Sequence, residues 1–274
     1  MSGLVLVNGM PTTMVSVFDR GLSYGDGLFE TIRFVRGEAP LWSRHMRRLQ
    51  DSCARLRLPE PDAQLLLDEA VAVTVGLEHA VVRITLTRGL GERGYAPPAS
   101  PVMSRIVAGF DAPVMSGPAY VCGVRVCWCE THLAPQPLLA GMKHLNRLEQ
   151  VLARAEWSDA AVMEGLLRDT DGLVVSGTMT NLFAVIDGVL VTPAVDRCGV
   201  AGVARAEVLA FRPDAQVVAL RDEDLARASE VFLSSSVRGI LPVQAVDDTV
   251  YVPGPVTRAL QWHWHDLGFP MEQA

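Results

Sequence analysis

The chain has 274 residues, of which 49% are hydrophobic and 20% are charged. This length and composition allow one large domain or two modest ones around a sizeable core. The formal net charge is -7, so binding of nucleic acid would require a local basic patch. The only dense group of basic residues, Arg44 to Arg48, lies in an amphipathic helical pattern. We therefore expect no nucleic-acid partner.

The sequence carries no sign of a membrane span or of secretion. No apolar run approaches the ~18 residues of a span, and Met1 to Gly9 has no basic start and no cleavage signature. The five cysteines are an odd number, which argues against a disulfide framework and for a reducing compartment. These observations favour a cytoplasmic protein.

The predicted elements of the first half mix helices with strands. Hydrophobic periodicity predicts helices over 43–56 and 62–75 and strands over 81–87 and 105–109. A stretch rich in Pro and Gly, Asp111 to Pro118, then interrupts the pattern. We take residues 113–117 as a linker between a domain of residues 1–112 and a larger one of residues 118–274.

The second half has the same mixed character. The pattern predicts four strands and two helices there; the strands cover 121–129, 160–168, 182–186 and 230–234, and the helices cover 146–155 and 201–210. The whole chain is thus expected to be an α/β protein with two lobes, a layout that favours a ligand site in the cleft between them.

The segment Gly141-Met142-Lys143-His144-Leu145-Asn146 places one lysine at a change of pattern, although a solvated surface lysine is the alternative on these residues alone. A breaker-rich connection precedes Lys143, and apolar residues at helical spacing follow it, namely Leu148, Val151, Leu152 and Ala155. Lys143 is therefore expected at the start of a helix, where the macrodipole disfavours an ammonium. A neutral amine is what Schiff-base chemistry with a carbonyl cofactor requires.

The stretch "AGMKHLNRLEQVLAR" resembles the cofactor-lysine segment of the 4-amino-4-deoxychorismate lyases. These are pyridoxal 5'-phosphate (PLP) enzymes of the fold-type IV group, together with branched-chain and D-amino-acid aminotransferases. Further stretches resemble the group in matching order along nearly the whole chain: "SVFDRGLSYGDGLFETIRF", "RHMRRLQDSCARL", "LTRGLGERGYAPP", "GTMTNLFAVIDGVLVTP", "CGVAGVARAEVL" and "ASEVFLSSSVRGILPV". The resemblance implies a small N-terminal α/β domain, a larger C-terminal mixed α/β domain, and the cofactor in the cleft between them.

The cofactor phosphate is expected at the start of the helix that follows Gly199. Free backbone N–H groups and the helix dipole make an anion site there, although the glycines could also serve a tight turn. The resemblance implies that Gly202 and the amides of Val203 and Ala204 hold the phosphate. It adds Arg48 as a charged partner, with Arg47 the alternative if the register differs, and Ser236 as a hydroxyl donor.

The ring nitrogen of the cofactor is where this sequence departs from the group. Most members carry a glutamate in the segment before "NLF", whereas Ser176 stands at that position here. A hydroxyl can bond to the nitrogen but cannot hold a positive charge on it, so the cofactor should withdraw electrons less strongly. The alternative is a misregister in which a carboxylate arrives from elsewhere; Glu164 and Asp171 lie nearby in the sequence.

Substrate contacts are expected from a Gly-flanked loop. If that loop is extended, Arg93 and Tyr95 point the same way, and a guanidinium with a phenol suits a substrate with two carboxylates. In the related D-amino-acid aminotransferases the matching loop reaches across from the partner subunit, so the resemblance implies a homodimer. A solvated loop arginine is the alternative. Tyr24 and Arg238 are further candidates.

No metal site is expected. Cys127, Cys129 and His132 do not have a zinc spacing, and "VRVCWC" indicates a strand. The resemblance implies a PLP-dependent lyase that converts 4-amino-4-deoxychorismate to 4-aminobenzoate and pyruvate, a step towards folate. Two alternatives stay open: an aminotransferase acting on D- or branched-chain amino acids, and a PLP-binding homologue without activity.

Overall fold

The computed structural model describes residues 4–271, so the first three residues of the apolar run Met1–Gly9 lie outside it. Contacts divide the chain into two compact units. The first unit runs to Pro113 and also includes Met142–Asn146, and the second contains Val114–Gly141 and the chain from Arg147 onward. The segment that carries Lys143 is therefore packed with the first unit, although in the sequence both the residues before it and the residues after it belong to the second unit.

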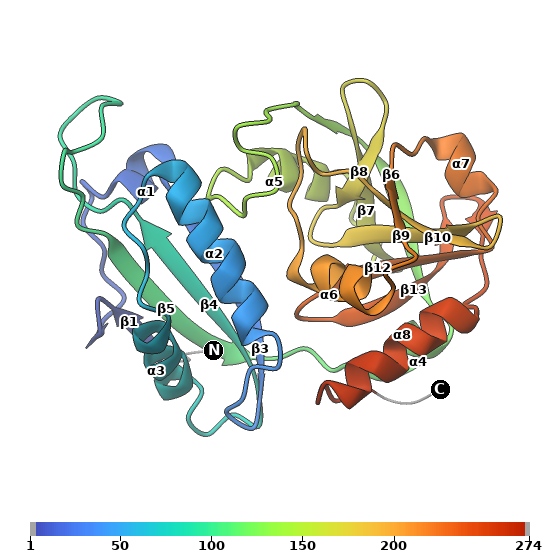
Figure 1. Cartoon of the computed structure of the whole chain (residues 1–274), viewed down its shortest axis with the longest axis horizontal. Helices are drawn as coiled ribbons and strands as arrows, with labels where there is room; N and C mark the ends of the chain where they lie inside the picture. Colours follow the sequence, from blue (N-terminus) through green and yellow to red (C-terminus); the bar gives the residue numbers. More distant parts are fainter. Residues whose placement is uncertain (1–3, 272–274) are drawn as a thin grey trace. The chain divides into compact units, whose positions relative to one another are not determined.

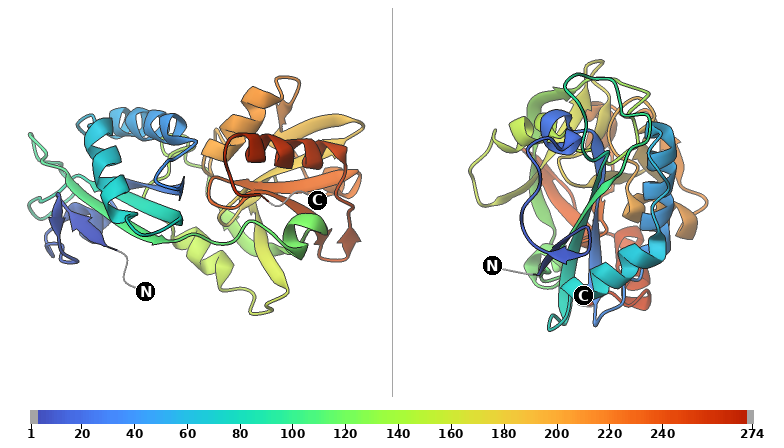
Figure 2. Two further views of the ribbon diagram at one scale, coloured as in Figure 1. Left: turned by 90° about the horizontal axis from the view of Figure 1, so that it is seen from below. Right: turned by 90° about the vertical axis from the view of Figure 1, so that its left-hand side faces the viewer.

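The first unit is an antiparallel sheet with helices. Its elements are β1 (Val5–Val7), β2 (Met10–Pro11), α1 (Arg20–Tyr24), β3 (Gly27–Val35), α2 (Trp42–Leu56), α3 (Ala63–Val73), β4 (His79–Thr87) and β5 (Ser104–Asp111). The strand order is β2-β1-β5-β4-β3. Helices α2 and α3 cover the same face of this sheet, and both contact its strands (Figures 1 and 2).

Alternation along β3 decides which side chains meet the helices. Leu28, Glu30, Ile32 and Phe34 are all buried, and side chains two apart in a strand share one face. The buried positions of α2, among them His45 and Leu49, recur at helical spacing. Because Glu30 bonds to residues of α2, this is the covered face, and a carboxylate sits in an otherwise apolar layer.

The second unit is built on a mixed nine-stranded sheet. Its elements are α4 (Pro118–Val121), β6 (Val124–Leu133), α5 (Leu148–Arg154), β7 (Val162–Asp169), β8 (Val174–Gly177), β9 (Asn181–Ile186), β10 (Val189–Pro193), α6 (Val203–Phe211), β11 (Gln216–Val218), α7 (Asp222–Ala226), β12 (Glu230–Ser235), β13 (Gly239–Val246), β14 (Thr249–Val250) and α8 (Pro255–Asp266). The order is β11-β10-β9-β12-β13-β6-β7-β8, with β14 on β13. The sheet curls, since β8 at one end also contacts β9.

Two predictions from the sequence need correction here. Helix α5 begins at Leu148, not at residue 146, and its apolar residues Leu148, Val151 and Leu152 are 60% to 76% exposed. Only Ala153 of this helix is buried. These three apolar residues therefore face outward. The strand predicted from residue 121 begins at Val124, because Pro118–Val121 form the short helix α4.

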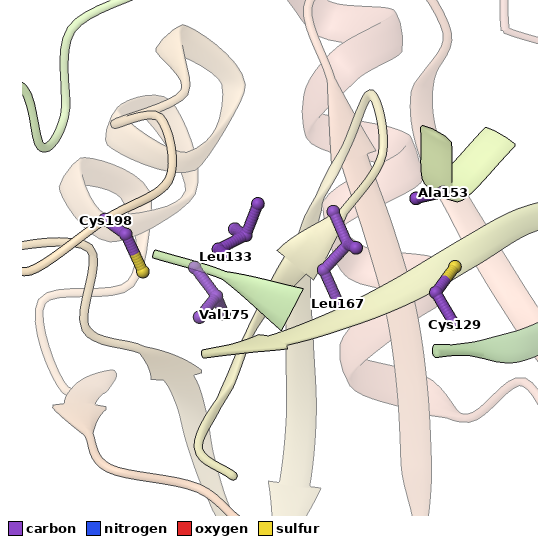
Figure 3. Close-up of a cluster of buried hydrophobic side chains, with 6 residues drawn as sticks. All are labelled: Cys129, Leu133, Ala153, Leu167, Val175 and Cys198. Atoms are coloured by element: carbon purple, nitrogen blue, oxygen red, sulfur yellow. The ribbon is translucent and has the colours of Figure 1, made fainter. Parts of the chain in front are cut away.

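Of the two cysteines weighed as metal ligands, Cys129 belongs to the core of the second unit, whereas Cys127 is half-buried. Figure 3 shows one buried cluster of apolar side chains, which consists of Cys129, Leu133, Ala153, Leu167, Val175 and Cys198. Burial raises the pKa of the Cys129 thiol to about 12, which keeps it protonated. Within the described part of the chain, no group of three or more His, Cys, Asp or Glu side chains could hold a metal ion. None of the helices in residues 4–271 is long and apolar enough to cross a membrane.

Candidate active site

Lys143 lies on a short extended segment that pairs with the free edge of β3. The Phe29 N–H donates to the Lys143 carbonyl (2.9 Å), the Leu145 N–H donates to the Gly27 carbonyl (3.0 Å), and Leu28 and His144 form an antiparallel bridge. The prediction that Lys143 opens a helix is wrong. Since α5 begins only at Leu148, and the dipole effect is confined to a helix's own first turn, the macrodipole has no bearing on this amine.

The half-buried Lys143 side chain lies against an aromatic ring. Its Nζ is 4.3 Å from the ring centroid of Phe29. The guanidinium carbon of Arg83, on the neighbouring strand β4, is 4.4 Å from the same centroid. Cation–π attraction therefore holds two basic side chains at one ring. Their charges would favour an anionic ligand near this edge of the sheet.

The chain contains no other lysine. Its 24 basic residues of the Lys and Arg types are 23 arginines and Lys143. An arginine keeps its proton in proteins and does not form Schiff bases with aldehydes under physiological conditions. If a cofactor aldehyde is to be attached to a lysine, Lys143 is the only candidate.

A buried polar cluster connects β3 to α2 in the same unit. Arg48 donates from Nε to Glu30 Oε1 (2.8 Å) and from Nη2 to Oε2, and the Nδ1 of His45 lies 2.7 Å from Oε2. Burial alone would raise the pKa of Glu30, but the charge of Arg48 and the bonds to His45 and Arg48 lower it to about 2. Arg48 thus faces inward, whereas Arg47 is exposed.

His45 is neutral in this cluster. Burial lowers its pKa and outweighs the bond to Glu30, and the charges of Arg48 and Lys143 act in the same direction as burial. The neutral ring donates from Nδ1 to the Glu30 carboxylate, so its Nε2 is an acceptor. This Nε2 is buried and has no hydrogen-bond partner within the described structure. Because the charge of Lys143 contributes to the lowered pKa of His45, Lys143 is close enough to this cluster to act on it electrostatically.

The start of α6 has the form expected of an anion site. Its N-cap is Gly202, and no side chain caps the helix, so the first backbone N–H groups, those of Val203 and Ala204 among them, are left for a ligand. Asn181 supports the preceding loop by donating to the carbonyl of Val200 (2.9 Å). A Cβ at Gly202 would lie 1.9 Å from Oδ1 of Asn181, which explains why this position is glycine.

Ser176 is buried on β8, and its hydroxyl donates to the carbonyl of Gly177 (2.9 Å). The neighbouring carboxylate of Glu164 is fully engaged. It accepts bonds from the N–H groups of Gly165, Thr178 and Met179 and from the hydroxyls of Thr178 and Thr180. Asp171, the other nearby acid, pairs with Arg197. Both acids that could have replaced a glutamate at position 176 thus have structural partners.

The turn between β12 and β13 carries the candidates Ser236 and Arg238. The Ser235 hydroxyl stabilises this turn, since it accepts from the N–H groups of Val237 (3.2 Å) and Arg238 (3.3 Å). The Arg238 carbonyl accepts from Tyr120 (2.9 Å). Ser236 and Arg238 are both partly exposed, so each side chain is accessible at the turn.

The loop with Arg93 and Tyr95 belongs to the first unit. Both side chains are exposed, and the chain bends from Arg93 to Tyr95, with Gly94 at a φ of 110°. The extended loop considered above is therefore not what the structure has, and the rule for side chains two apart does not apply. The Tyr95 ring instead packs against Tyr24, with centroids 5.5 Å apart.

The sequence matches a known family. The family model described as amino-transferase class IV matches residues 27–246, which is most of the chain. The chain belongs to the class IV aminotransferase family.

Members of the family with both lyase and aminotransferase names are similar to this chain. An aminodeoxychorismate lyase of Vibrio harveyi is 37% identical over 93% of this chain and 97% of its own length. The crystal structure of a 4-amino-4-deoxychorismate lyase from Pseudomonas aeruginosa has a TM-score of 0.90 at 47% identity, covering 96% of this chain and 98% of its own. The branched-chain aminotransferase of Escherichia coli has a TM-score of 0.83 at 26% identity, covering 97% and 94%. The expected two-lobed α/β fold is confirmed.

Within this class IV chain, the first unit holds Lys143, Arg48, Tyr24, Arg93 and Tyr95. The second unit holds the candidates at the start of α6, on β8 and in the β12–β13 turn. Sequence reasoning missed three side chains of the first unit, namely Arg20, Glu30 and Arg83. A charged residue inside an apolar strand pattern, as at Glu30 in "GLFETIRF", is the signal that could have drawn attention to one of them.

Proposed function

We propose that this protein is a PLP-dependent carbon–oxygen lyase that converts 4-amino-4-deoxychorismate to 4-aminobenzoate and pyruvate. The observation that carries the proposal is Lys143, the only lysine of the chain, held on the sheet edge over Phe29. The likeness to the lyases of Vibrio harveyi and Pseudomonas aeruginosa supports the choice of lyase over aminotransferase. The reaction would be a step towards folate in the cytoplasm.

The residues present fit the cofactor's phosphate. The uncapped start of α6 offers the amides of Val203 and Ala204 beside Gly202, and Ser236 would add a hydroxyl. Arg48 would bring positive charge. Because Glu30 already holds its Nε and Nη2, this guanidinium is fixed in place before any ligand arrives.

Chain connectivity also favours this arrangement. The Gly141 N–H donates to the Gly199 carbonyl (3.0 Å), and the Ala201 N–H donates to the Gly141 carbonyl (3.0 Å). Lys143 follows Gly141 with one residue between, so their Cα atoms are at most ~7.6 Å apart in any conformation. The covalent chain therefore keeps the lysine close to the loop that leads into α6.

Lys143 would perform both proton transfers. When bound, PLP supplies an aldehyde that links to an amine and a ring that withdraws electrons from the carbon next to it. With cofactor and substrate bound, the free Lys143 amine would take the proton from the amine-bearing ring carbon of the substrate. The neighbouring carbon–oxygen bond breaks, the ring becomes aromatic, and the lysine returns a proton to the leaving enolpyruvyl fragment, which is released as pyruvate. Aromatisation makes the step effectively irreversible.

Ser176 is proposed to face the ring nitrogen. This is consistent with the commitment of Glu164 to the turn over Thr178–Thr180, which leaves that acid without a free oxygen. With a serine at the ring nitrogen, the cofactor ring withdraws electrons less strongly than it does with a carboxylate there. Elimination needs negative charge to be stabilised only briefly, whereas transamination needs it to be stabilised for longer.

The substrate carboxylates are assigned to Arg93 and Tyr95 of a partner subunit, with Tyr24 and Arg238 as further contacts. A homodimer is supported by exposed apolar side chains in the first unit; Met14, Val17, Phe18, Leu22 and Leu90 are each 60% to 81% exposed. In the second unit, the outward face of α5 is also apolar. Exposed apolar groups of this extent are typical of a surface that another chain covers.

A steady-state assay for products tests the proposal. The purified protein with PLP and 4-amino-4-deoxychorismate should release pyruvate and 4-aminobenzoate in equal amounts without any added keto acid. Product formation that requires a keto acid would identify an aminotransferase instead. Binding of PLP without turnover of either kind would identify a homologue that is not an enzyme.

A further inference from the structure

The loop that carries Arg93 and Tyr95 is anchored by a buried arginine that the proposed reaction does not use. Arg20, at the start of α1, is only 4% exposed. Its guanidinium donates to three successive carbonyls of the loop, those of Gly94 (3.1 Å), Tyr95 (3.0 Å) and Ala96 (3.3 Å). One side chain thus determines the path of the backbone through the bend.

The same bend is held from its other side by Tyr24. The Tyr24 hydroxyl accepts from the Gly94 N–H (3.0 Å), and the Arg20 guanidinium carbon lies 4.9 Å from the centre of the Tyr24 ring. Gly91 leaves room for the Arg20 side chain, since a Cβ there would lie 2.7 Å from its Cδ. The two loop glycines therefore serve different purposes. Gly91 leaves room for the Arg20 side chain, and Gly94 allows the positive φ of the bend.

Asp26 fixes the arginine in turn. Its Oδ2 accepts from the Nε of Arg20 (2.8 Å) and from the Nε of Arg88 (2.8 Å). Burial would raise the pKa of Asp26, but the bonds and charges of Arg88 and Arg20 bring it below its usual range, so the carboxylate stays ionised. Arg88 also donates to the carbonyls of Leu56 and Arg57 at the end of α2. The loop is thereby connected to the helix that carries Arg48.

The backbone of the bend is fixed while the side chains of Arg93 and Tyr95 remain exposed. We infer that Arg20, held by Asp26, is a positioning residue that sets this bend in each protomer and so prepares the active site of the partner subunit. The inference rests on the proposed function, in which the loop serves the neighbouring site. A loop ordered in advance loses less entropy when it contacts substrate, which improves binding more than the chemical step.

The first test compares three variants of the holoenzyme. Arg20→Gln removes the anchor. Gly94→Ala strains the bend through its positive φ but meets no atom within 4 Å, so it perturbs the loop without disturbing the core. Arg36→Gln is the control, because Arg36 forms an exposed pair with Glu78 in the same unit. For the first two we expect KM to rise about tenfold and kcat to change less than about twofold, with cofactor absorbance unchanged.

Hydrogen exchange measures the anchoring itself. Peptides that cover residues 92–97 should exchange faster in Arg20→Gln and Gly94→Ala than in the wild type or in Arg36→Gln, while β3 and β4 keep their protection. Unchanged exchange in the loop of Arg20→Gln would overturn the inference. Faster exchange with an unchanged KM would overturn it as well, since the anchor would then have no part in substrate binding.

Subunit mixing shows which site the anchor serves. At substrate below KM, mixing Lys143→Ala with Arg93→Ala should restore up to about a quarter of wild-type activity, because half of the dimers are mixed and each has one intact site. Arg20→Gln should behave like Arg93→Ala: it gains activity with Lys143→Ala and none with Arg93→Ala. If Arg20→Gln instead gained activity with Arg93→Ala and none with Lys143→Ala, the inference would be overturned. Failure of the Arg93→Ala mixture despite subunit exchange would instead refute the shared site of the proposed function, and hydrogen exchange would still decide the anchoring.

Discussion

The buried carboxylate of Glu30 should make a large and pH-dependent contribution to stability. Its pKa falls from an ordinary 4.5 to about 2 in the folded chain. At about 1.4 kcal/mol for each pKa unit, this corresponds to about 3 kcal/mol of stability at pH 7. Glu30→Gln keeps the shape of the side chain but leaves Arg48 without its counter-charge. The loss expected from breaking a buried pair, about 3 to 5 kcal/mol, is of the same size.

The sign of the pH dependence follows from the lowered pKa. The unfolded chain binds the proton first, so the stabilisation is complete above about pH 4.5 and is lost as the pH falls towards 2. Urea denaturation followed by circular dichroism should therefore show a difference between wild type and Glu30→Gln of about 3 kcal/mol at pH 7. At pH 3 the difference should be roughly half of that. Glu78→Gln, which removes an exposed pair with Arg36, should cost no more than about 0.5 kcal/mol. A loss below about 1 kcal/mol, or a difference that is the same at pH 7 and pH 3, would refute the ionised buried pair.

Three further substitutions test the cofactor site. Lys143→Ala should abolish the visible absorbance of bound cofactor and nearly all turnover; a cofactor that borohydride still fixes to this variant would contradict the assignment. Ser176→Glu should hold a proton on the ring nitrogen and yield more pyridoxamine phosphate with simple amino acids, and a variant with unchanged spectrum and side reaction would show that Ser176 lies elsewhere. Gly202→Ala should raise the Kd for PLP about tenfold, because its Cβ meets Asn181 at 1.9 Å; equal affinity in fluorescence titrations would argue against phosphate at this helix.

Local sequence patterns sufficed for much of the fold. The helix expected over 43–56 is α2, Trp42–Leu56, and the strand expected over 81–87 is the main part of β4, His79–Thr87. Both have strong periodicity and buried faces, so local and tertiary preferences agree. Lys143 itself was recognisable from the motif around it.

The parts that failed depend on contacts between distant residues. Nothing near Lys143 indicates that Leu28 will pair with His144, and this bridge holds the segment extended, so that it is not the start of a helix. Likewise, the bond from Arg20 to the Gly94 carbonyl joins residues 74 positions apart. In α5 the helical period was right, but the helix begins at Leu148 and not at residue 146, because the chain up to Leu145 is still bonded to Gly27 at the edge of the first sheet.

The single lysine has a practical consequence for work with this protein. Lys143 is the only side-chain amine in the chain, and it is only half-buried. Reagents that join proteins through lysines, such as glutaraldehyde and bis-succinimidyl esters, therefore have no lysine on the remaining surface to react with. Exposure to them should inactivate the protein in proportion to the label taken up by one residue, and bound PLP should protect it. Under the proposed function, label found on Lys143, counted apart from label on the α-amino group, would therefore titrate active sites, and the oligomeric state is better measured by sedimentation or light scattering.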